Sequence, residues 1–597
     1  MFLRKVRPRG RGSRPIYWEL VESYRTARGS RQRTVAYLGK LSRRELDGWQ
    51  KLSSNLNGEA PPMAGLFETP ATDEASDVEL VDVKGLRLQR LRRFGEVYLA
   101  WTLWRMLGLD QCLAAAMPAG REGVPWATVV AILCIARFCR PSSELQIEKH
   151  FYPATALEDL LGVPPALVHT DRLYAGLDEL LKQKKTIERH LCQRLGQLFE
   201  LSYDVLLYDL TSTYFEGQCA ANPMARRGYS RDSRGDCPQV VIALIVTSDG
   251  YPLGYEVFDG NTADSTTVRR IVEKVEAEHG QANRIWVMDR GNVSEANLAF
   301  LRDRGGKYIV GVPKAMLRRV QGQITAEGWQ QVREGIEVKL VKLASTDASE
   351  TLILCRSEDR VAKESAMLER FIQHMEEGLQ RLSRSAEKGR LKDLETAHQR
   401  LGRLREKNWR ASACFEVNIE PLDPPAGKAR LRVTWVRDEQ AKRNLCGCYL
   451  LRTNLDPIDP VALWRQYIQL VDAEWAFRIS KDELELRPIW HQHAARVQGH
   501  ILVCFIAYAM WKTLSGWMQA GGLGDAPRPL VEELSRIQSG DVVLPTRHAD
   551  GSAGPTLVVR CVTRPDEHQE VLLSRLGMKL PNQLTRFCVK EEAMPAP

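Results

Sequence analysis

The order of apolar segments between residues 205 and 312 constrains the fold more than any other feature. "DVLLYDL" and "PQVVIALIVTSDGYPLGYEVFDG" predict three strands, the last two joined at an Asp-Gly turn of the kind that closes hairpins. "DSTTVRRIVEKVEAEHG" and "SEANLAFLRDRG" have the apolar spacing of helices, and "RIWVMDRG" and "KYIVGVP" are short apolar runs typical of buried strands. The order predicts an α/β fold, a mixed sheet with helices on both faces.

The net charge of +9 is confined to the N-terminus. Residues 1–50 contain 13 of the 84 Lys and Arg residues and four of the 75 Asp and Glu residues, so the other 547 residues carry 71 of each. Within this segment, "PIYWELVESYR" and "RQRTVAYLGKL" predict a β-hairpin. A basic arm most often binds a polyanion, so nucleic acid is the expected partner, with a solubilising tail as the alternative.

A chain of 597 residues is too long for one hydrophobic core and is expected to divide into domains. The predicted parts are a basic hairpin arm (1–50), a linker (51–84), a helical region expected to bind DNA (85–201), the first part of the α/β core (202–314), an insertion domain (315–450), the second part of the core (451–520) and a C-terminal tail (521–597). The insertion is expected to be rich in strands. Its charged helical pair, near residues 363–409, fits an interaction arm as well as a plain scaffold.

No apolar run has the length of a membrane span, and "ILVCFIAYAMW" (501–511) predicts a buried helix. The first residues lack the apolar core of a signal peptide. Thirteen scattered cysteines without a CxxC pair indicate neither a zinc site nor a disulfide framework. We therefore expect a cytoplasmic protein without a membrane partner.

Two aspartates are expected at the ends of predicted strands. Asp209 closes "LLYD" and Asp289 closes "WVMD", so neighbouring strands would bring the two carboxylates together. Like charges at that distance need a cation between them, or one is protonated. Hard divalent ions with oxygen ligands suit such a pair, although two unrelated strand ends would give the same pattern.

The segment "WRQYIQLVDAEWAFRISKDELELRP" predicts a single helix that strengthens the metal hypothesis. Tyr467, Glu474 and Lys481 are spaced by seven residues and share one helical face, which Arg478 joins. A separate apolar stripe, which includes Val471 and Trp475, is expected to pack on the sheet. The helix would thus present a third carboxylate with cations for phosphates beside it, unless Glu474 and Arg478 are an exposed pair.

These motifs also carry a family resemblance. "YDLTSTYFEG", "GYSRDSRGD", "FDGNTADSTT", "VMDRGNVSEAN", "EWAFRISK" and "RPIWHQHAARVQGHI" resemble, in this order, bacterial insertion-sequence transposases of the DDE type, over about residues 200–515. The subgroup resembled has a Tyr–x2–Arg–x3–Glu–x6–Lys signature on its last catalytic helix. Here the positions hold Tyr467, Leu470, Glu474 and Lys481, so a leucine replaces the arginine, and Arg478 is the expected substitute.

The resemblance implies a ribonuclease-H-like fold in which Asp209, Asp289 and Glu474 form the catalytic triad. The triad would hold two Mg²⁺ or Mn²⁺ ions per active site. The implied function is a transposase that binds the terminal inverted repeats of its element, cleaves DNA and joins it to target DNA, as a homodimer on DNA. A structure-specific nuclease with the same metal site and a catalytically inactive DNA-binding descendant are the alternatives.

Basic side chains near these motifs are expected to contact DNA phosphates. Some lie in the loop after "YFEG", for which a solvated loop is the alternative. The expected contacts are Tyr467, Arg478, Lys481, Arg226, Arg227, Arg231 and Arg290. The hydroxyl residues Thr211–Thr213 are expected at the edge of the DNA-binding cleft.

Overall fold

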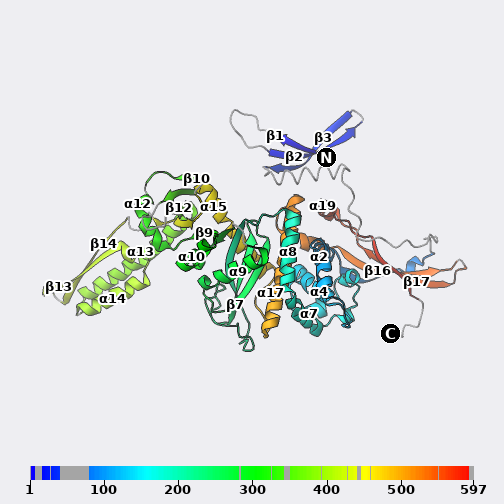
Figure 1. Cartoon of the computed structure of the whole chain (residues 1–597), viewed down its shortest axis with the longest axis horizontal. Coiled ribbons are helices and arrows are strands. Elements are labelled where there is room, and N and C mark those ends of the chain that lie inside the picture. Colours follow the sequence, from blue (N-terminus) through cyan, green and yellow to red (C-terminus); the bar gives the residue numbers. More distant parts are fainter. Residues whose placement is uncertain are drawn as a thin grey trace.

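The structure of the protein is a computed structural model. It describes residues 2–6, 17–26, 29–39, 80–280, 284–324, 326–341, 350–391, 393–426, 428–439, 445–456, 459–548 and 550–589. Most of the expected linker, 51–84, therefore lies outside the described residues. The molecule is elongated, with a large sheet and its helices in the middle (Figure 1).

The predicted strand order is confirmed in the middle of the molecule. The strands are β5 (Val205–Tyr214), β6 (Gln239–Thr247), β7 (Pro252–Asp259), β8 (Ile285–Met288) and β9 (Lys307–Gly311). They lie side by side in the order β7-β6-β5-β8-β9. The meander β5–β6–β7 is antiparallel, whereas β8 and β9 run parallel to β5, so the sheet is mixed.

Alternate residues along β5 belong to two different cores, one on each face of the sheet. Leu206 and Tyr208 pack with α9 (Val268–His279) and α10 (Glu295–Asp303), whereas Leu207 belongs to the core that contains α16 (Leu470–Arg478) and α17 (Ala494–Ala520). Side chains of a strand alternate between faces, so this two-residue period places helices on both faces of the sheet.

The long apolar helix α17 is a core element, as the sequence predicts. It packs against α2 (Gly95–Met106), α4 (Trp126–Cys139), α7 (Thr170–Lys182) and α8 (Lys184–Phe199) on one side and against β7 on another. It is the one helix in the described part of the chain long and apolar enough to span a bilayer, and 83% of its most apolar window is buried inside the protein. Its composition is explained by this burial.

The segment expected to form an insertion domain is divided between two places. Four strands, β10 (Gln330–Arg333), β11 (Ile336–Val341), β12 (Thr351–Ser357) and β15 (Cys448–Thr453), extend the central sheet from β9 to give nine strands. Only the hairpin of β13 (Phe415–Ala426) and β14 (Ala429–Arg437), with α13 (Glu358–Glu387) and α14 (Leu394–Lys407), builds its own core. This unit, the helical arm, projects from one end of the molecule (Figure 1).

The segment expected as a C-terminal tail, 521–597, is folded over most of its length. It forms α18 (Pro527–Leu534), α19 (Glu567–Arg575) and the strands β16 (Gln538–Arg547), β17 (Ala553–Val562) and β18 (Gln583–Val589). These strands pair with β4 (Arg87–Arg93), which precedes the helical region, in a four-stranded sheet. A partner almost 450 residues earlier in the chain cannot be recognised from the local pattern of the tail.

The N-terminal hairpin is confirmed and gains a strand. β2 (Tyr17–Thr26) pairs with β3 (Gly29–Gly39) as predicted, and β1 (Phe2–Val6) adds a third antiparallel strand.

Candidate active site

Asp209 and Asp289 are neighbours because of strand register. The parallel pairing of β5 with β8 sets Tyr208 opposite Met288, so the next residues on the two strands are the two aspartates. β8 ends at Met288, and Asp289 continues into a short 3₁₀ turn. Asp209 is within β5 rather than at its end, because the pairing with β6 continues to Tyr214. The strand register therefore places the two aspartates next to each other, as predicted. The prediction that β5 ends at Asp209 is wrong.

Glu474, on the helix α16, lies near Asp209 and Asp289. Alternation along β5 directs Asp209 to the face of Leu207, which α16 covers. Ala473, Ala476 and Phe477 bury one side of α16 in that core, while Glu474 lies on its exposed side.

The three carboxylates influence one another electrostatically. Burial, with smaller contributions from the charges of Glu474 and Asp289, raises the pKa of Asp209 to about 7, although a backbone hydrogen bond and, least of all, the charge of Arg231 oppose the increase. Loss of water contact and the charge of Asp289 raise the pKa of Glu474, and Arg360 opposes this increase. At neutral pH the site therefore holds negative charge that its own surroundings do not neutralise.

Within the described residues, none of the three carboxylates forms an ion pair with Lys or Arg. Their oxygens are the ligand type that divalent ions such as Mg²⁺ prefer, and a cation would relieve the repulsion that raises the pKa of Asp209. In the same part of the chain, no three His, Cys, Asp or Glu side chains are grouped closely enough to hold a metal ion. The three carboxylates therefore fit a divalent ion by donor type, whereas their spacing in the structure does not by itself form a metal site.

The helix that carries Glu474 is interrupted twice, which corrects the prediction of one continuous helix. α15 (Pro460–Ile468) ends before α16 begins, with a tight bond from Asp472 N–H to Gln469 O. A π-helical turn, Ile479–Glu483, follows α16. There, Ser480 Oγ donates to Ala476 O and competes for a helical acceptor, as hydroxyl side chains do in bent helices.

The interruptions change which side chains share a face. The apolar stripe expected to pack on the sheet is exposed instead, with Val471 at 40% and Trp475 at 50% exposure. Leu470 is buried, so the leucine at the arginine position of the signature is a core residue. Arg478 is exposed and lies over the ring of Trp475, with Asp482 as an ion-pair partner at 3.9 Å.

Lys481 does not lie free beside Glu474. Its side chain is only 9% exposed and donates to Asp232 at 2.7 Å, and Arg487 binds the same carboxyl oxygen. Asp232 comes from the loop between β5 and β6, so this buried pair connects that loop to the end of the helix that carries Glu474.

The arginines of that loop fall into two groups. Arg226 and Arg227 are exposed. Arg231 donates to both carboxyl oxygens of Asp264, at 2.7 and 2.6 Å, and its backbone N–H donates to Ser212 Oγ at 3.0 Å. Residues Thr211–Thr213 are buried in β5, so the prediction that they form the edge of a DNA cleft is wrong.

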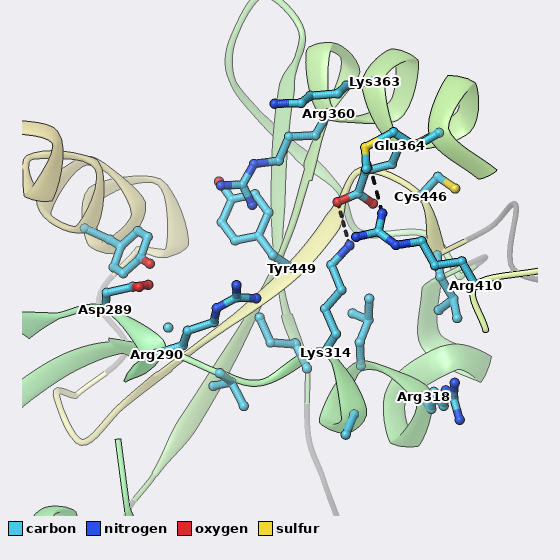
Figure 2. A pocket seen from close by; sticks show the side chains of 18 of the residues that line it. Asp289, Arg290, Lys314, Arg318, Arg360, Lys363, Glu364, Arg410, Cys446 and Tyr449 are labelled. Carbon is cyan, nitrogen blue, oxygen red and sulfur yellow. Dashed lines mark hydrogen bonds and ion pairs between the residues drawn. The ribbon is translucent and has the colours of Figure 1, made fainter. Parts of the chain in front are cut away.

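A cavity of about 990 Å³ opens beside Asp289 and Glu474. Asp289 and Arg290 lie on one side of it, and side chains of α13, β15 and the turn after α14 lie across from them (Figure 2). The cations that line it are Arg290, Lys314, Arg318, Arg360, Lys363 and Arg410. Lys314 is paired with Glu364 at 2.5 Å. Cations therefore outnumber carboxylates around a space that borders two of the three acidic residues.

Tyr467 lines the same cavity as Asp289 and Glu474. A methyl group on Gly311 would come within 2.8 Å of the Tyr467 hydroxyl, so glycine at that position gives the ring its place. Partial burial and the charge of Asp289 raise the pKa of Tyr467 well above its usual range, which keeps the hydroxyl protonated and able to donate.

Arg360 is the main residue that the sequence analysis missed. It comes from α13, more than 100 residues before Glu474 in the chain, yet its charge acts on Glu474 and Tyr467. Its guanidinium lies over the ring of Tyr449, 4.4 Å from the ring centre. The repeated basic residues along α13 could be seen in the sequence. The position of Arg360 beside the site could not be predicted, because it depends on how the helical arm joins the sheet.

Comparisons with known proteins identify the family of the chain. The family model for the transposase DDE domain matches residues 200–509, and the model for the N-terminal domain of IS1634 family transposases matches residues 3–61. The first match spans more than half of the chain, so the chain belongs to the transposases with a DDE domain. It is a DNA transposase, of a family that generally uses divalent metal ions for nuclease and transesterification chemistry.

Among solved structures, the chain is similar to the piggyBac transposase in a synaptic complex with hairpin DNA. The identity is 8%, the match covers 74% of this chain and 79% of that one, and the TM-score is 0.36. Among curated proteins, none matches the chain significantly.

The raised pKa of Asp209 predicts a pH-dependent gain in stability for Asp209→Asn in metal-free buffer. The native state holds the Asp209 proton up to a pH of about 7, whereas an unfolded chain releases it near the ordinary aspartate pKa of 3.8. Ionisation therefore costs the native protein stability as pH rises through this interval, and the amide avoids that cost. Melting temperatures measured from pH 4 to pH 8 with a chelator should diverge in favour of Asp209→Asn as pH rises. A constant difference across the range would contradict the assignment.

Proposed function

We propose that the chain is a ribonuclease-H-like transposase that cleaves DNA at the ends of its insertion sequence and joins the released strand to target DNA. Asp209, Asp289 and Glu474 are its catalytic triad. The observation that carries this proposal is the register that sets Asp209 beside Asp289, under a helix that supplies Glu474 to the same face. The strand order β7-β6-β5-β8-β9, an antiparallel meander followed by two parallel strands, supports the fold assignment.

The three carboxylates would hold two divalent ions, Mg²⁺ or Mn²⁺. When bound, such ions activate water or a 3′-hydroxyl and stabilise charge on the scissile phosphate. Asp209, which is influenced by the charges of both Asp289 and Glu474, would hold the ions together with these two residues. No protein nucleophile is required, because positioning and charge stabilisation account for catalysis.

The surrounding side chains have separate roles in DNA binding. Arg290, Arg360 and Tyr467 border the carboxylates and are placed to hold the phosphates next to the cleaved bond. The exposed residues Arg226, Arg227 and Arg478 are proposed as contacts further along the backbone.

Lys481 and Arg231 remain proposed contacts, although each already has a carboxylate partner. Their first role is to order the loop that follows β5. Pairing of two element ends requires two active sites, so we propose that the protein acts as a homodimer on DNA, in the bacterial nucleoid.

Alanine at any one triad position should abolish Mg²⁺-dependent cleavage of a terminal-repeat substrate while binding of that substrate persists. Each substitution removes oxygen ligands but leaves the DNA-contacting cations in place. The matched control is Asp303→Ala, an exposed carboxylate at the end of α10, which should cleave at the normal rate. Unimpaired cleavage by a triad variant would remove that residue from the assignment. Joining of precut ends to a target, measured in parallel, separates a transposase from a simple nuclease.

Arg360 is predicted to supply the cation that the signature places at position 470. Loss of one charge-assisted contact costs about 1.5–3 kcal/mol, which corresponds to roughly 10- to 150-fold in rate. Arg360→Gln should lower the cleavage rate by such a factor, and Arg360→Lys by less, in single-turnover assays with saturating DNA. Equal rates for Arg360→Gln and the unsubstituted protein would show that Arg360 is dispensable.

A further inference from the structure

The long helix of the arm, α13, carries its charges in separate stripes. Its buried side chains, Leu368, Ile372, Met375, Leu379, Leu382 and Ala386, follow steps of three and four residues and face the β13–β14 hairpin and α14. On the opposite side, the same steps give a second series. That series, which we call the basic stripe, consists of Arg360, Lys363, Met367, Arg370, His374, Glu377, Arg381, Arg384 and Lys388.

The basic stripe faces solvent. All of its members except Met367, which lines the cavity, are exposed. Among the described residues, Arg370, Arg384 and Lys388 form no ion pair, and Arg381 is 3.7 Å from Glu377, the one acidic residue of the stripe. Unpaired cations repeated along one face are a pattern that ordinary surface helices avoid by alternating charge signs.

Three acidic residues of α13 lie outside the stripe and have partners. Glu369 and Glu376 lie on the flank that faces β14 and pair with Arg437, at 3.3 and 3.8 Å. Glu364 pairs with Lys314 and accepts a hydrogen bond from the backbone of Gly447. These three acidic residues make internal contacts, whereas the basic side chains of the stripe are exposed.

The stripe begins at the candidate active site and leads away from it. Arg360 and Lys363 line the cavity beside Asp289 and Glu474 (Figure 2). From Arg360 to Lys388 a helix extends about 42 Å, at about 1.5 Å per residue, which exceeds one turn of duplex DNA, roughly 34 Å. The arm projects on the opposite side of the central sheet from the N-terminal strands and the helical region (Figure 1).

We propose that the basic stripe of α13 holds the duplex that flanks the insertion sequence, on the outer side of the cleaved bond. This inference rests on the proposed function, since it takes the cleaved bond to lie at the triad. Flanking DNA differs at every insertion site, so only contacts to the phosphate backbone can hold it, and flexible Arg and Lys side chains make such contacts. The helical region and the basic N-terminal hairpin lie on the other side of the site. They then bind the end of the element, whose sequence is constant.

The test compares element ends that carry no flanking DNA with ends that carry roughly 10 or 20 base pairs of it, about one or two helical turns. The variant replaces Arg370, Arg381, Arg384 and Lys388 by Gln. Each phosphate contact contributes about 0.9 to the slope of log K against log salt, so the slope for flanked substrates should fall by about 3 to 4 in magnitude. Binding of the unflanked end, and its joining to target DNA, should not change.

A charge-conserving variant is the matched control. Exchange of the three arginines for Lys and of Lys388 for Arg keeps the charge and should retain binding of flanked DNA. All four positions are exposed, so neither variant should alter the melting temperature. Equal binding of flanked DNA by the Gln variant and the unsubstituted protein would overturn the proposal. So would a Gln variant that loses as much affinity for the unflanked end as for flanked DNA, or a charge-conserving variant that loses as much affinity as the Gln variant. If the unsubstituted protein fails to cleave at all, the proposed function itself fails, which is a separate outcome.

Discussion

The pairing of β5 with β8 is the contact on which the rest of the site depends. A parallel register that sets Tyr208 opposite Met288 also sets Asp209 beside Asp289, and a shift of one residue would direct Asp209 to the other face of the sheet. Because both strands are covered by helices on both faces, this register is strongly fixed. The fold thereby holds two like charges together in surroundings that raise the pKa of Asp209 to about 7.

The remaining parts of the chain can be understood by their relation to this pair. α16 brings Glu474 over the same face, and the breaks on either side of it allow Leu470 to pack in the core while Lys481 binds Asp232. The strands that follow β9 extend the sheet and carry the helical arm to the edge of the site. Cations from the arm and from the turns after β8 and β9 then surround a cavity next to the acidic residues.

Much of the central fold could be predicted from the sequence, because strand and helix periodicities are local properties. The five strands of the core, its two crossover helices and the apolar helix α17 were identified in this way. Features that depend on pairing between distant segments of the chain could not be predicted. The strands of residues 315–450 were expected in a separate domain. The C-terminal segment was expected as a tail, because its pairing with β4 joins distant parts of the chain.

The same limit applies to the site. The three acidic residues could be identified by motif and spacing, and their pairing by strand order. The face of the helix that carries Glu474 could not be predicted, because a seven-residue spacing assumes an unbroken helix. The π-helical turn at Ile479–Glu483 changes the direction in which the following side chains point. Arg360 was missed because its contact with the site depends on the path of the chain through the insertion. The assignment of the triad itself remains a proposal.

Calorimetric titration of the full chain with Mn²⁺ tests the central claim most directly. If Asp209, Asp289 and Glu474 share a metal site, Mn²⁺ should bind saturably at pH 7 and release protons, because Asp209 is partly protonated there. Asp289→Asn should weaken this binding strongly, and Asp209→Asn should also remove the proton release, whereas Asp303→Asn should change neither. Equal Mn²⁺ affinity and equal proton release in all four proteins would contradict the account.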